Sequence, residues 1–392
     1  MIRRLRRSVS GLLYGPWRLA VQRGKAVIGQ AELRQLATPM RPPSRWHLRT
    51  EHYRIHGMPA PPLLASLAGE QADPGAFLAV LPEAELVGRH ATAVWQGRVV
   101  LETVLGSSGY LLHHNDPRAL LLRCVLPLQQ RWPTALLLAN HLNANYFHLV
   151  AEALPLLEAL DQAPALGIAA SDPLIVVNAP VPGFVWQWLE LFGIAPARVR
   201  PWSHSRVRVE RLLLPSLRYG RLCDEHPDWG RHLYPRWALE FVRRRALAAV
   251  AGLRLSVQEP ARRVFLSRPR SGSRGLLNHE AVAACLRRHG YREVLAEQLT
   301  VREQIALFAS LTHLVAIHGA GMVNLIVSTK VRLIELFPAN RDFCFTYQFL
   351  QITGHFCERH HLLACPADAQ QNMKVPLDVL EGLVQDIDAP DW

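Results

Sequence analysis

The chain has 392 residues, 49% of them hydrophobic, and it contains ten tryptophans. This composition excludes a disordered chain, and the length exceeds that of one hydrophobic core of ordinary size, so we expect two folded domains. The formal net charge of +12 is uneven, because residues 1–31 carry seven basic side chains and no acidic one, which leaves +5 for the other 361 residues.

The segment of residues 1–45 mixes basic side chains with bulky apolar ones and ends in a proline-rich turn at 39–43. Such a mixture suits the surface of an anionic bilayer, where each basic residue contributes about 1 kcal/mol. A frayed basic tail explains the same composition equally well. Peripheral membrane contact and a loose tail are therefore two interpretations of this segment.

Two features of the chain favour a location in the cytoplasm. If segment 1–45 binds a bilayer, the protein would attach peripherally to the inner membrane. No run reaches the roughly 18 apolar residues expected of a spanning helix, and the N-terminus lacks an apolar run followed by a small-residue cleavage site. Six cysteines are scattered along the chain, which suits reduced thiols better than a disulfide framework.

Residues 46–250 form the predicted first domain, in which strands and helices alternate. Short β-type runs between 77 and 135 come first. Apolar patterns then predict strands at 135–139, within 172–180 and at 206–215, and helices at 145–161, 183–193 and 237–253. The alternation indicates a sheet flanked by helices, and we place the domain boundary after residue 250.

Residues 251–392 form the predicted second domain, whose order is more regular. Periodicity predicts strands at 263–267, 291–295, 313–317 and 332–336 and helices at 278–288, 301–310, 321–328, 343–352 and 376–387. Alternation at this spacing predicts a parallel α/β sheet with right-handed crossovers.

Polar residues follow three strands of this predicted sheet: Arg268, Arg270 and Arg274 after the first, His318 after the third, and Glu335 at the end of the fourth. The carboxyl ends of parallel strands share one edge, where ligands bind. Because arginine forks suit phosphate oxygens, we expect Arg268 with either Arg270 or Arg274 to hold a diphosphate. We expect Glu335 to accept from ribose hydroxyls. A solvated basic turn and an ion pair are the plainer alternatives.

The third strand ends in the loop His318-Gly319-Ala320-Gly321, and a helix follows. Glycine lets the backbone approach a ligand, and the N–H groups of a helix start bind anions, so we assign the loop to the donor phosphates. His318 would donate to a phosphate or polarise a leaving group, although a histidine that caps the turn is the structural alternative. Asn324, on the same helix, more simply fastens the loop. The third glycine of a dinucleotide fingerprint is missing, which disfavours a nicotinamide enzyme.

In the first domain, His148 and Glu152 lie four residues apart on the predicted helix 145–161, so they share a face. A carboxylate beside an imidazole fixes its tautomer and raises its basicity, which suits a general base that takes a proton from a hydroxyl. The alternative is a buried polar pair that anchors the helix.

Two other patterns resemble metal-binding motifs, but we assign neither of them to a metal site. Cys357, His360, His361 and Cys365 cluster on a predicted strand, but no second pair stands at zinc-site spacing. The Asp-x-Asp sequence at 386–388 has a form that holds a divalent cation in many sugar-nucleotide enzymes, but near the chain end a solvated terminus is the simpler interpretation. We therefore expect no metal site.

Three stretches together resemble glycosyltransferase family 61, which includes many bacterial capsular-polysaccharide biosynthesis proteins. They are NYFHLVAEALPLL at 145–157, RVFLSRPRSGSRGLLNHEAV at 263–282, and EQLTVREQIALFASLTHLVAIHGAGMVNLIVSTKVRLIELFP at 297–338. They follow one another in the family's order. The chain departs from the family's pattern at 328–331, where Ser-Thr-Lys-Val replaces the common proline-glycine turn.

This resemblance implies a GT-B architecture, in which two Rossmann-like domains face each other across a cleft. The second domain would bind the nucleotide sugar and the first the acceptor, and the sugar would be transferred with inversion at the anomeric carbon. His148 and Glu152 would face the cleft. By position, the resemblance assigns these residues to the donor side: Arg268, Asn278, His318, Gly319, Gly321 and Glu335.

Without a convincing Asp-x-Asp pair, Arg268, His318 and the helix start would stabilise the departing nucleoside diphosphate in place of a metal. We thus expect a metal-independent transferase that needs a nucleotide-sugar donor and no further cofactor. Its acceptor would be a glycan or lipid-linked glycan in capsular or lipopolysaccharide biosynthesis. The competing interpretation is a non-catalytic nucleotide- or polyanion-binding protein, or a scaffold of a polysaccharide assembly complex. Nucleic acid is not an expected partner, since basic and aromatic residues do not interleave beyond the N-terminal segment.

Overall fold

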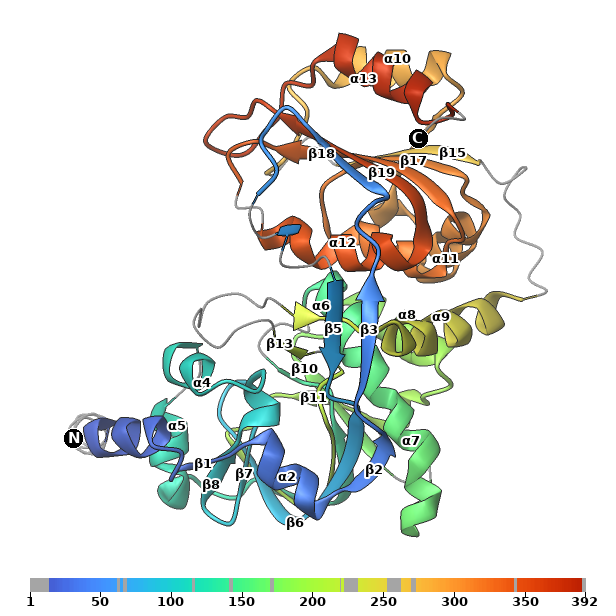
Figure 1. Cartoon of the computed structure of the whole chain (residues 1–392). Coiled ribbons are helices and arrows are strands. Elements are labelled where there is room, and N and C mark those ends of the chain that lie inside the picture. Colours follow the sequence, from blue (N-terminus) through green and yellow to red (C-terminus); the bar gives the residue numbers. More distant parts are fainter. Residues whose placement is uncertain are drawn as a thin grey trace. The chain divides into compact units, whose positions relative to one another are not determined.

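The computed structural model describes most of the chain (Figure 1), namely residues 14–61, 64–65, 69–114, 117–140, 144–169, 173–218, 220–221, 232–251, 262–268, 273–341 and 344–389. The chain forms two compact units. The first consists of Met1–Ser44 and Asp73–Gly230, and the second of Arg45–Ala72 and Arg231–Trp392. Among the described residues, none of the helices combines the length and the apolar character needed to cross a membrane.

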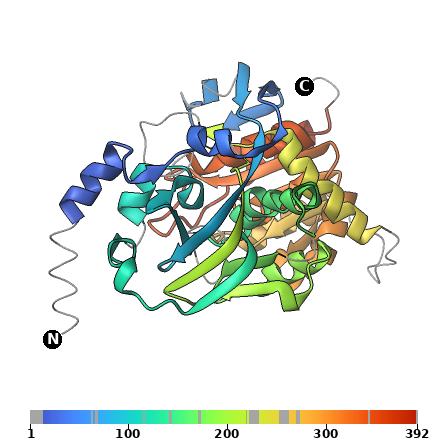
Figure 2. The ribbon, with the colours of Figure 1, turned by 90° about the horizontal axis from the view of Figure 1, so that it is seen from below.

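The first unit is built on one mixed sheet of order β1-β8-β7-β6-β12-β9-β10-β11, in which β2 also pairs with β6. Its strands are β1 (Val27–Ile28), β2 (Thr38–Arg41), β6 (Ala76–Val87), β7 (Thr92–Trp95), β8 (Arg98–Val100), β9 (Gln130–Leu137), β10 (Leu174–Asn178), β11 (Val199–Trp202) and β12 (Arg206–Pro215). The strands from β12 to β11 run parallel, whereas β6 pairs antiparallel with β12 and β7. The long strands β6 and β12 lie side by side (Figure 2) and contribute Leu81 and Leu212 to the core.

Helices and short helical turns connect these strands. They are α2 (Gln30–Leu36), η1 (Leu101–Val104), α4 (Ser108–His114), α5 (Pro117–Leu121), η2 (Arg123–Val125), η5 (Ala163–Leu166), α8 (Gly183–Leu191) and η6 (Pro196–Arg198), together with the pieces of the predicted helix 145–161. Those pieces are α6 (Tyr146–His148), the π-helical η3 (Leu149–Ala153), the 3₁₀-helical η4 (Leu154–Leu157) and α7 (Glu158–Gln162). Pro155 has no N–H to give to a regular α-helix, so the hydrogen-bond pattern changes around it.

The chain leaves the first unit along β3 (Ser44–Leu48) and returns along β5 (Gly69–Asp73), and these two strands pair. Between them, β4 (Tyr53–His56) joins the sheet of the second unit next to β19 (Cys357–Cys365). We call residues 45–72 the N-terminal excursion, because they belong to the second unit although they precede most of the first.

The second unit has a parallel sheet of order β16-β15-β17-β18-β19-β4. Its other strands are β15 (Arg263–Ser267), β16 (Arg292–Leu295), β17 (His313–Ile317) and β18 (Val331–Pro338), and its helices are α9 (Arg236–Val250), α10 (His279–Arg288), η7 (Ala296–Gln298), α11 (Val301–Ser310), η8 (Ala320–Val327), α12 (Cys344–Phe356) and α13 (Leu377–Asp386). Helices α10 and α13 pack together on one face, and α11, η8 and α12 cover the other (Figure 1). The predicted parallel α/β sheet is confirmed.

Two parts of the predicted first domain belong instead to the second unit. Helix α9 packs on α11 and η8, and the N-terminal excursion supplies β4. The apolar pattern of a short strand does not show which distant strand it pairs with. Boundaries predicted from sequence order alone therefore differ from those of the compact units. The mixed sheet of the first unit also departs from a purely parallel Rossmann-like sheet, since β6, β7 and β8 pair antiparallel.

Candidate active site

The sheet of the second unit reverses its order between β15 and β17. Counted along the chain, the strands from β15 to β19 lie in the order 2-1-3-4-5, with β16 on one side of β15 and β17 on the other. In doubly wound sheets, ligands bind beyond the carboxyl ends of the strands at such a switch point. Arg268 directly follows β15 and His318 directly follows β17, so both residues lie where the topology favours a ligand.

Two arginines converge there on the backbone carbonyl of His318, and a third adds to their positive field. Nη1 of Arg268 and Nη1 of Arg274 donate to this oxygen at 3.2 and 3.1 Å. Burial, together with the charges of Arg268 and Arg341, lowers the pKa of Arg274 to about 10. Burial also lowers the pKa of Arg268, although Glu297 opposes that shift. The described residues give neither Arg268 nor Arg274 a hydrogen-bonded carboxylate, so an anion would stabilise this cluster.

Gly319 makes room for one of these arginines. A Cβ at this position would lie 2.6 Å from Nη1 of Arg268, so any side chain would push the guanidinium away from the carbonyl of His318. The φ of Gly319 is 174°, an extended value open to any residue, so the glycine serves close approach. At Gly321, by contrast, a Cβ would meet only ordinary van der Waals contacts. Ala320 and Gly321 begin η8, which is a 3₁₀ helix where the sequence predicts a helix over 321–328.

The imidazole of His318 pairs with Glu335. Nδ1 of His318 lies 2.5 Å from Oε1 of Glu335, whose other oxygen lies 2.9 Å from Nε2 of His360. All three side chains are at most 2% exposed. Burial lowers the pKa of His318, the Glu335 carboxylate opposes this shift, and Arg274 and Arg341 add to it. Neutral His318 therefore donates Nδ1–H to the carboxylate and keeps Nε2 as an acceptor.

Glu335 differs from the expectation that it accepts from ribose hydroxyls. Both of its oxygens are held by histidines, and the side chain is fully buried. The physical reason is its place in the strand, because β18 continues to Pro338 and Glu335 lies inside it, not beyond its end. The geometry points to a residue that orients His318.

Asn278 and Asn324 are bound within the fold. The side chain of Asn278 donates to the carbonyl of Val375 at 2.8 Å and accepts from its N–H at 3.0 Å, which fastens the start of α10. Nδ2 of Asn324 donates to Oε1 of Gln304 at 2.8 Å and ties η8 to α11, as the sequence suggests. Arg270 lies outside the described residues.

In the first unit, His148 and Glu152 come together as their spacing predicts. Nδ1 of His148 lies 3.0 Å from Oε1 of Glu152, across one turn at the π-helical η3. Such π turns inside helices are frequent at functional sites. The side chain of His148 is 16% exposed and that of Glu152 only 2%, so a ring that reaches solvent lies beside a buried carboxylate.

Sequence reasoning misses two residues of the second unit's site. Arg341 follows β18 as Arg268 follows β15, and this shared position after a strand is a signal that could find it. His360 belongs to the metal-like pattern on β19, where successive residues alternate between the two faces of the sheet. His360 meets Glu335, whereas Nδ1 of His361 lies 2.8 Å from Nε2 of His56. The four residues of that pattern therefore do not converge.

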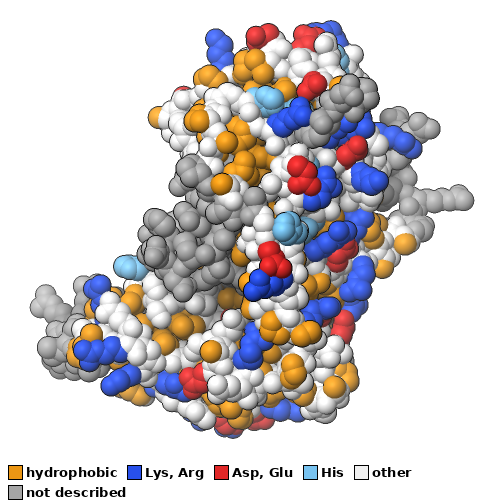
Figure 3. All heavy atoms as spheres, viewed as in Figure 1, with side chains coloured by type: hydrophobic (Ala, Val, Ile, Leu, Met, Phe, Trp, Pro, Cys, Tyr) orange, Lys and Arg blue, Asp and Glu red, His pale blue; other side chains and the backbone are white. Residues whose placement is uncertain are grey.

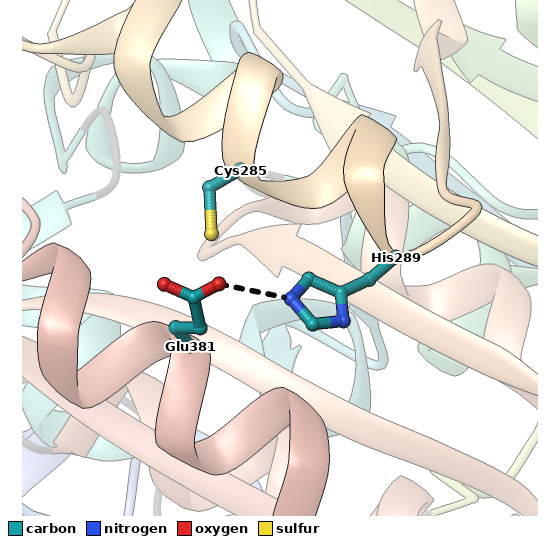
Figure 4. A group of neighbouring side chains, drawn as sticks. All are labelled: Cys285, His289 and Glu381. Carbon is teal, nitrogen blue, oxygen red and sulfur yellow. Dashed lines mark hydrogen bonds and ion pairs between the residues drawn. The ribbon is translucent and has the colours of Figure 1, made fainter.

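Figure 4 shows a different group of side chains that could bind a metal: Cys285 of α10, His289 directly after this helix, and Glu381 of α13. Their ligand atoms lie within 4.8 Å of one another. Nε2 of His289 and Nη2 of Arg288 each lie 3.3 Å from Oε1 of Glu381. Burial, and then the charge of Glu381, raises the pKa of the Cys285 thiol. A cation would have to displace both Arg288 and the thiol proton, so we assign this group to the packing of α10 on α13.

Asp388, at the end of the Asp-x-Asp sequence, is exposed but is also tied to the fold. It accepts from Nη2 of Arg263, Nε2 of His313 and Nη1 of Arg332, each at 2.6 Å. Burial alone would raise the pKa of Asp388, but these hydrogen bonds hold it well below its usual value. The three partners lie at the amino ends of β15, β17 and β18. Asp386 and Asp388 are exposed, as expected of a solvated end, but the sequence does not show the three partners that tie Asp388 to the strands.

Residues 146–333 match the family model described as Glycosyltransferase 61. The matched segment includes His148 and Glu152 in the first unit and Arg268, Arg274 and His318 in the second. A comparison with curated proteins finds no match. The family match confirms the resemblance found in the sequence motifs.

Proposed function

We propose, from the premise that residues 146–333 of this chain belong to glycosyltransferase family 61, that the protein moves a sugar from a nucleotide-sugar donor to a hydroxyl group of a glycan, with inversion at the anomeric carbon. The family supports glycosyl transfer in general. The inversion rests on the family resemblance, whereas the donor site and the residue roles rest on the geometry within each unit and on the chemistry that this geometry allows.

The observation that carries this proposal is the convergence of Arg268 and Arg274 at the switch point of the sheet. A nucleoside diphosphate would neutralise the mutual repulsion of these guanidinium groups, and their planar forks suit phosphate oxygens. Gly319 gives the Arg268 side chain its space, and the N–H groups of Ala320 and Gly321 at the start of η8 are further donors. We assign the donor diphosphate to this cluster.

In an inverting transfer, the acceptor oxygen forms its bond to the anomeric carbon while the bond from that carbon to the phosphate oxygen breaks. The electron pair of the broken bond leaves with the nucleoside diphosphate. Arginines placed where this charge develops stabilise the transition state. Because Arg268, Arg274 and Arg341 supply three positive charges there, we propose a reaction that needs no metal ion.

The acceptor hydroxyl must lose its proton during this displacement, and we assign that proton to Nε2 of His148. Glu152 lies 3.0 Å from Nδ1 of the same ring and would stabilise the imidazolium as it forms. The partial exposure of His148 lets an acceptor reach it, whereas the carboxylate of Glu152 is shielded from water.

We assign His318 to the leaving group. In the free protein, burial lowers the pKa of His318, and Arg274 and Arg341 add to this shift. A bound diphosphate would cancel these charges, and the imidazolium would then be flanked by two negative groups, the diphosphate and Glu335. Protonated at Nε2, the ring could donate to a phosphate oxygen.

For the cellular role, we propose bacterial capsular or lipopolysaccharide biosynthesis in the cytoplasm, with a glycan or a lipid-linked glycan as the acceptor. The support is the family resemblance. The mixture of basic and apolar residues in segment 1–45 supports peripheral contact with an anionic inner membrane.

A non-catalytic polyanion-binding or scaffold protein is the competing interpretation. Figure 3 shows Lys and Arg side chains interspersed with Asp and Glu on the face drawn, and no continuous basic surface covers that face. Polyanions bind best to clustered charge of one sign, so the face drawn is poorly suited to bind a polyanion.

The direct test is release of nucleoside diphosphate from UDP- and GDP-linked sugars by the purified full-length chain, with added saccharides as acceptors and with or without EDTA. We expect release from one donor class, unchanged in EDTA, and its loss in Arg268→Ala and Arg274→Ala. Release that disappears in EDTA would contradict the metal-independent mechanism. Absence of release from every donor, with intact folding, would favour the scaffold.

A further inference from the structure

Glu335 is the centre of a longer chain of buried polar side chains in the second unit. We propose that His360 and His52 are positioning residues, which fix the carboxylate of Glu335 and, through it, the tautomer of His318. The N-terminal excursion, which carries His52, would thereby take part in catalysis. The role of His318 rests on the proposed function, whereas the effect of His360 on the His318 ring does not.

A buried carboxylate needs partners on both of its oxygens. Glu335 is fully buried, and a charge so placed costs several kcal/mol unless hydrogen bonds compensate it. His318 occupies Oε1 and His360 occupies Oε2. If His360 were replaced by an apolar side chain, Oε2 would lose its donor from this ring, and the carboxylate could turn away from His318.

His360 is itself held in one orientation. Its Nδ1 lies 3.1 Å from Oγ1 of Thr353 on α12, and Nε2 of His52 lies 3.4 Å from the same oxygen. A neutral imidazole has one donor and one acceptor nitrogen, so a His360 that donates Nε2–H to Glu335 must accept at Nδ1. The Thr353 hydroxyl can give that proton to His360 or to the carbonyl of Leu350, which also lies 3.1 Å away. Nε2 of His52 can donate to the same hydroxyl oxygen and so helps to hold it beside His360.

The N-terminal excursion packs closely against His360 and against helix α12. Tyr53 pairs with His360 in the register of β4 and β19, and the centroid of its ring lies 4.6 Å from that of His360, edge to face. At Gly354 of α12, a Cβ would lie 2.8 Å from Cδ1 of Leu48 and 3.0 Å from the carbonyl of Arg49. This close approach fixes the excursion against the helix that carries Thr353. The excursion is thus built into the site.

The chain offers a matched control in the next residue. His361 lies on the same strand and is as fully buried as His360, but it faces the opposite side of the sheet and meets His56. Replacing either ring by phenylalanine keeps the volume and removes two ring nitrogens from the core. The two variants should therefore lose similar stability, while only His360→Phe changes the surroundings of Glu335.

The first measurement does not depend on catalysis. The proton on Nδ1 of His318 lies in a short hydrogen bond of 2.5 Å, so its NMR resonance should be far downfield, and His318→Phe identifies it by its loss. We expect the resonance to move in His360→Phe, to move less in His52→Phe, and to keep its position in His361→Phe. In His360→Gln, whose amide can donate to Glu335, it should return toward the wild-type position. An unchanged resonance in His360→Phe would overturn the inference.

The second measurement is the turnover of the donor that the wild-type protein accepts. We expect kcat to fall about 10- to 100-fold in His360→Phe, because a small misplacement of a catalytic group costs that much, with little change in KM. His360→Gln should recover most of the rate. The charged groups that act on the His318 ring are Glu335, Arg274 and Arg341. Because His360→Phe lets Glu335 turn away from this ring, the pH–rate profile of that variant should shift. Equal rate losses in His360→Phe and His361→Phe would show a merely structural role. If the wild type turns over no donor, the proposed function fails, and the NMR result alone decides the positioning role.

Discussion

The two units each contain a histidine paired with a glutamate, and the pairs differ in how the chain brings them together. His148 and Glu152 are four residues apart on one helical segment, 3.0 Å apart in space, with the histidine partly exposed. His318 directly follows β17, Glu335 lies in the adjacent parallel strand β18, and the two side chains are 2.5 Å apart and both buried. The first geometry suits proton exchange with an incoming acceptor, and the second suits a ring whose state is controlled by its fixed surroundings.

The contrast also separates the costs of disturbing each pair. Both glutamates are buried, and a buried group left without its partner costs about 1–3 kcal/mol. His148 reaches solvent, so its substitution should change the rate with little change in stability, whereas substitutions of Glu152 and of the second unit's pair should change both.

The largest effect should come from Glu335→Gln. The substitution removes the carboxylate that both His318 and His360 face, and we expect kcat to fall about 100- to 10,000-fold, the range associated with loss of acid–base assistance. The melting temperature should also fall. In the variant His148→Gln, whose histidine reaches solvent, the melting temperature should stay near that of the wild type. A Glu335→Gln protein with normal turnover would remove Glu335 from the mechanism.

His148→Gln should come next. We expect transfer to the acceptor to fall about 100-fold or more, because a general base contributes at least that much, while nucleoside diphosphate binding stays unchanged. The measurements are transfer rate and calorimetric binding of UDP or GDP on the same preparation. If binding weakens in parallel with the rate, His148 does not act as a base, and the division of roles between the two units fails.

Acid should destabilise the second unit. The following histidines of that unit have pKa values lowered mainly by burial: His52, His56, His313, His318, His355, His360 and His361. Since the unfolded chain binds these protons near pH 6.5 and the folded unit does not, stability is complete above that pH and is lost as the pH falls below it. Each such histidine contributes up to about 1.4 kcal/mol per pH unit.

Urea unfolding at a series of pH values from neutral to mildly acidic checks this expectation. The transition of the second unit should move to lower urea concentration with falling pH, and His361→Phe should make that dependence shallower. The pKa of His361 falls to about 3 because of burial, so its replacement removes one group that resists protonation. A transition that does not move between neutral and mildly acidic pH would show that these histidines titrate normally in the folded state.

The smallest effect should come from Asp388→Asn. Asp388 joins residues at the amino ends of the strands, whereas Arg268 and His318 lie just beyond carboxyl ends. Its side chain is about one-third exposed, so we expect a loss of about 1 kcal/mol in stability and an unchanged rate. Equilibrium unfolding and donor turnover measure the two. A lost rate at normal stability would place Asp388 in the function.

Features that depend on interactions between residues close in the sequence could be predicted, and features that depend on distant residues could not. The elements of the second unit and the pair His148–Glu152 depend on periodicity and on a spacing of four, both of which are local. The pair Glu335–His360 depends on the register between β18 and β19, in which Leu333 faces His360. No pattern within either strand encodes that register.

The domain boundaries were harder to predict for a related reason. The strand β4 has four residues and joins the second unit across a long stretch of sequence, and its pairing is decided by the packing of Leu48 and Tyr53 on α12 and β19. Within the metal-like pattern on β19, strand alternation places His360 and His361 on opposite faces of the sheet, which sequence distance alone does not show. The arginines after β15, in contrast, are at the position where the topology predicts a ligand.

The most direct test of the account is calorimetric titration of the full-length chain with UDP and with GDP, using the matching nucleosides as controls, in wild type, Arg274→Ala and Arg288→Ala. Arg288 is an exposed arginine of the same unit, on α10. We predict that one nucleoside diphosphate binds the wild type and Arg288→Ala equally, and that Arg274→Ala weakens it about 10- to 100-fold, as expected for a charged hydrogen bond. Equal binding by Arg274→Ala, or none by any protein, would contradict a donor site at this cluster.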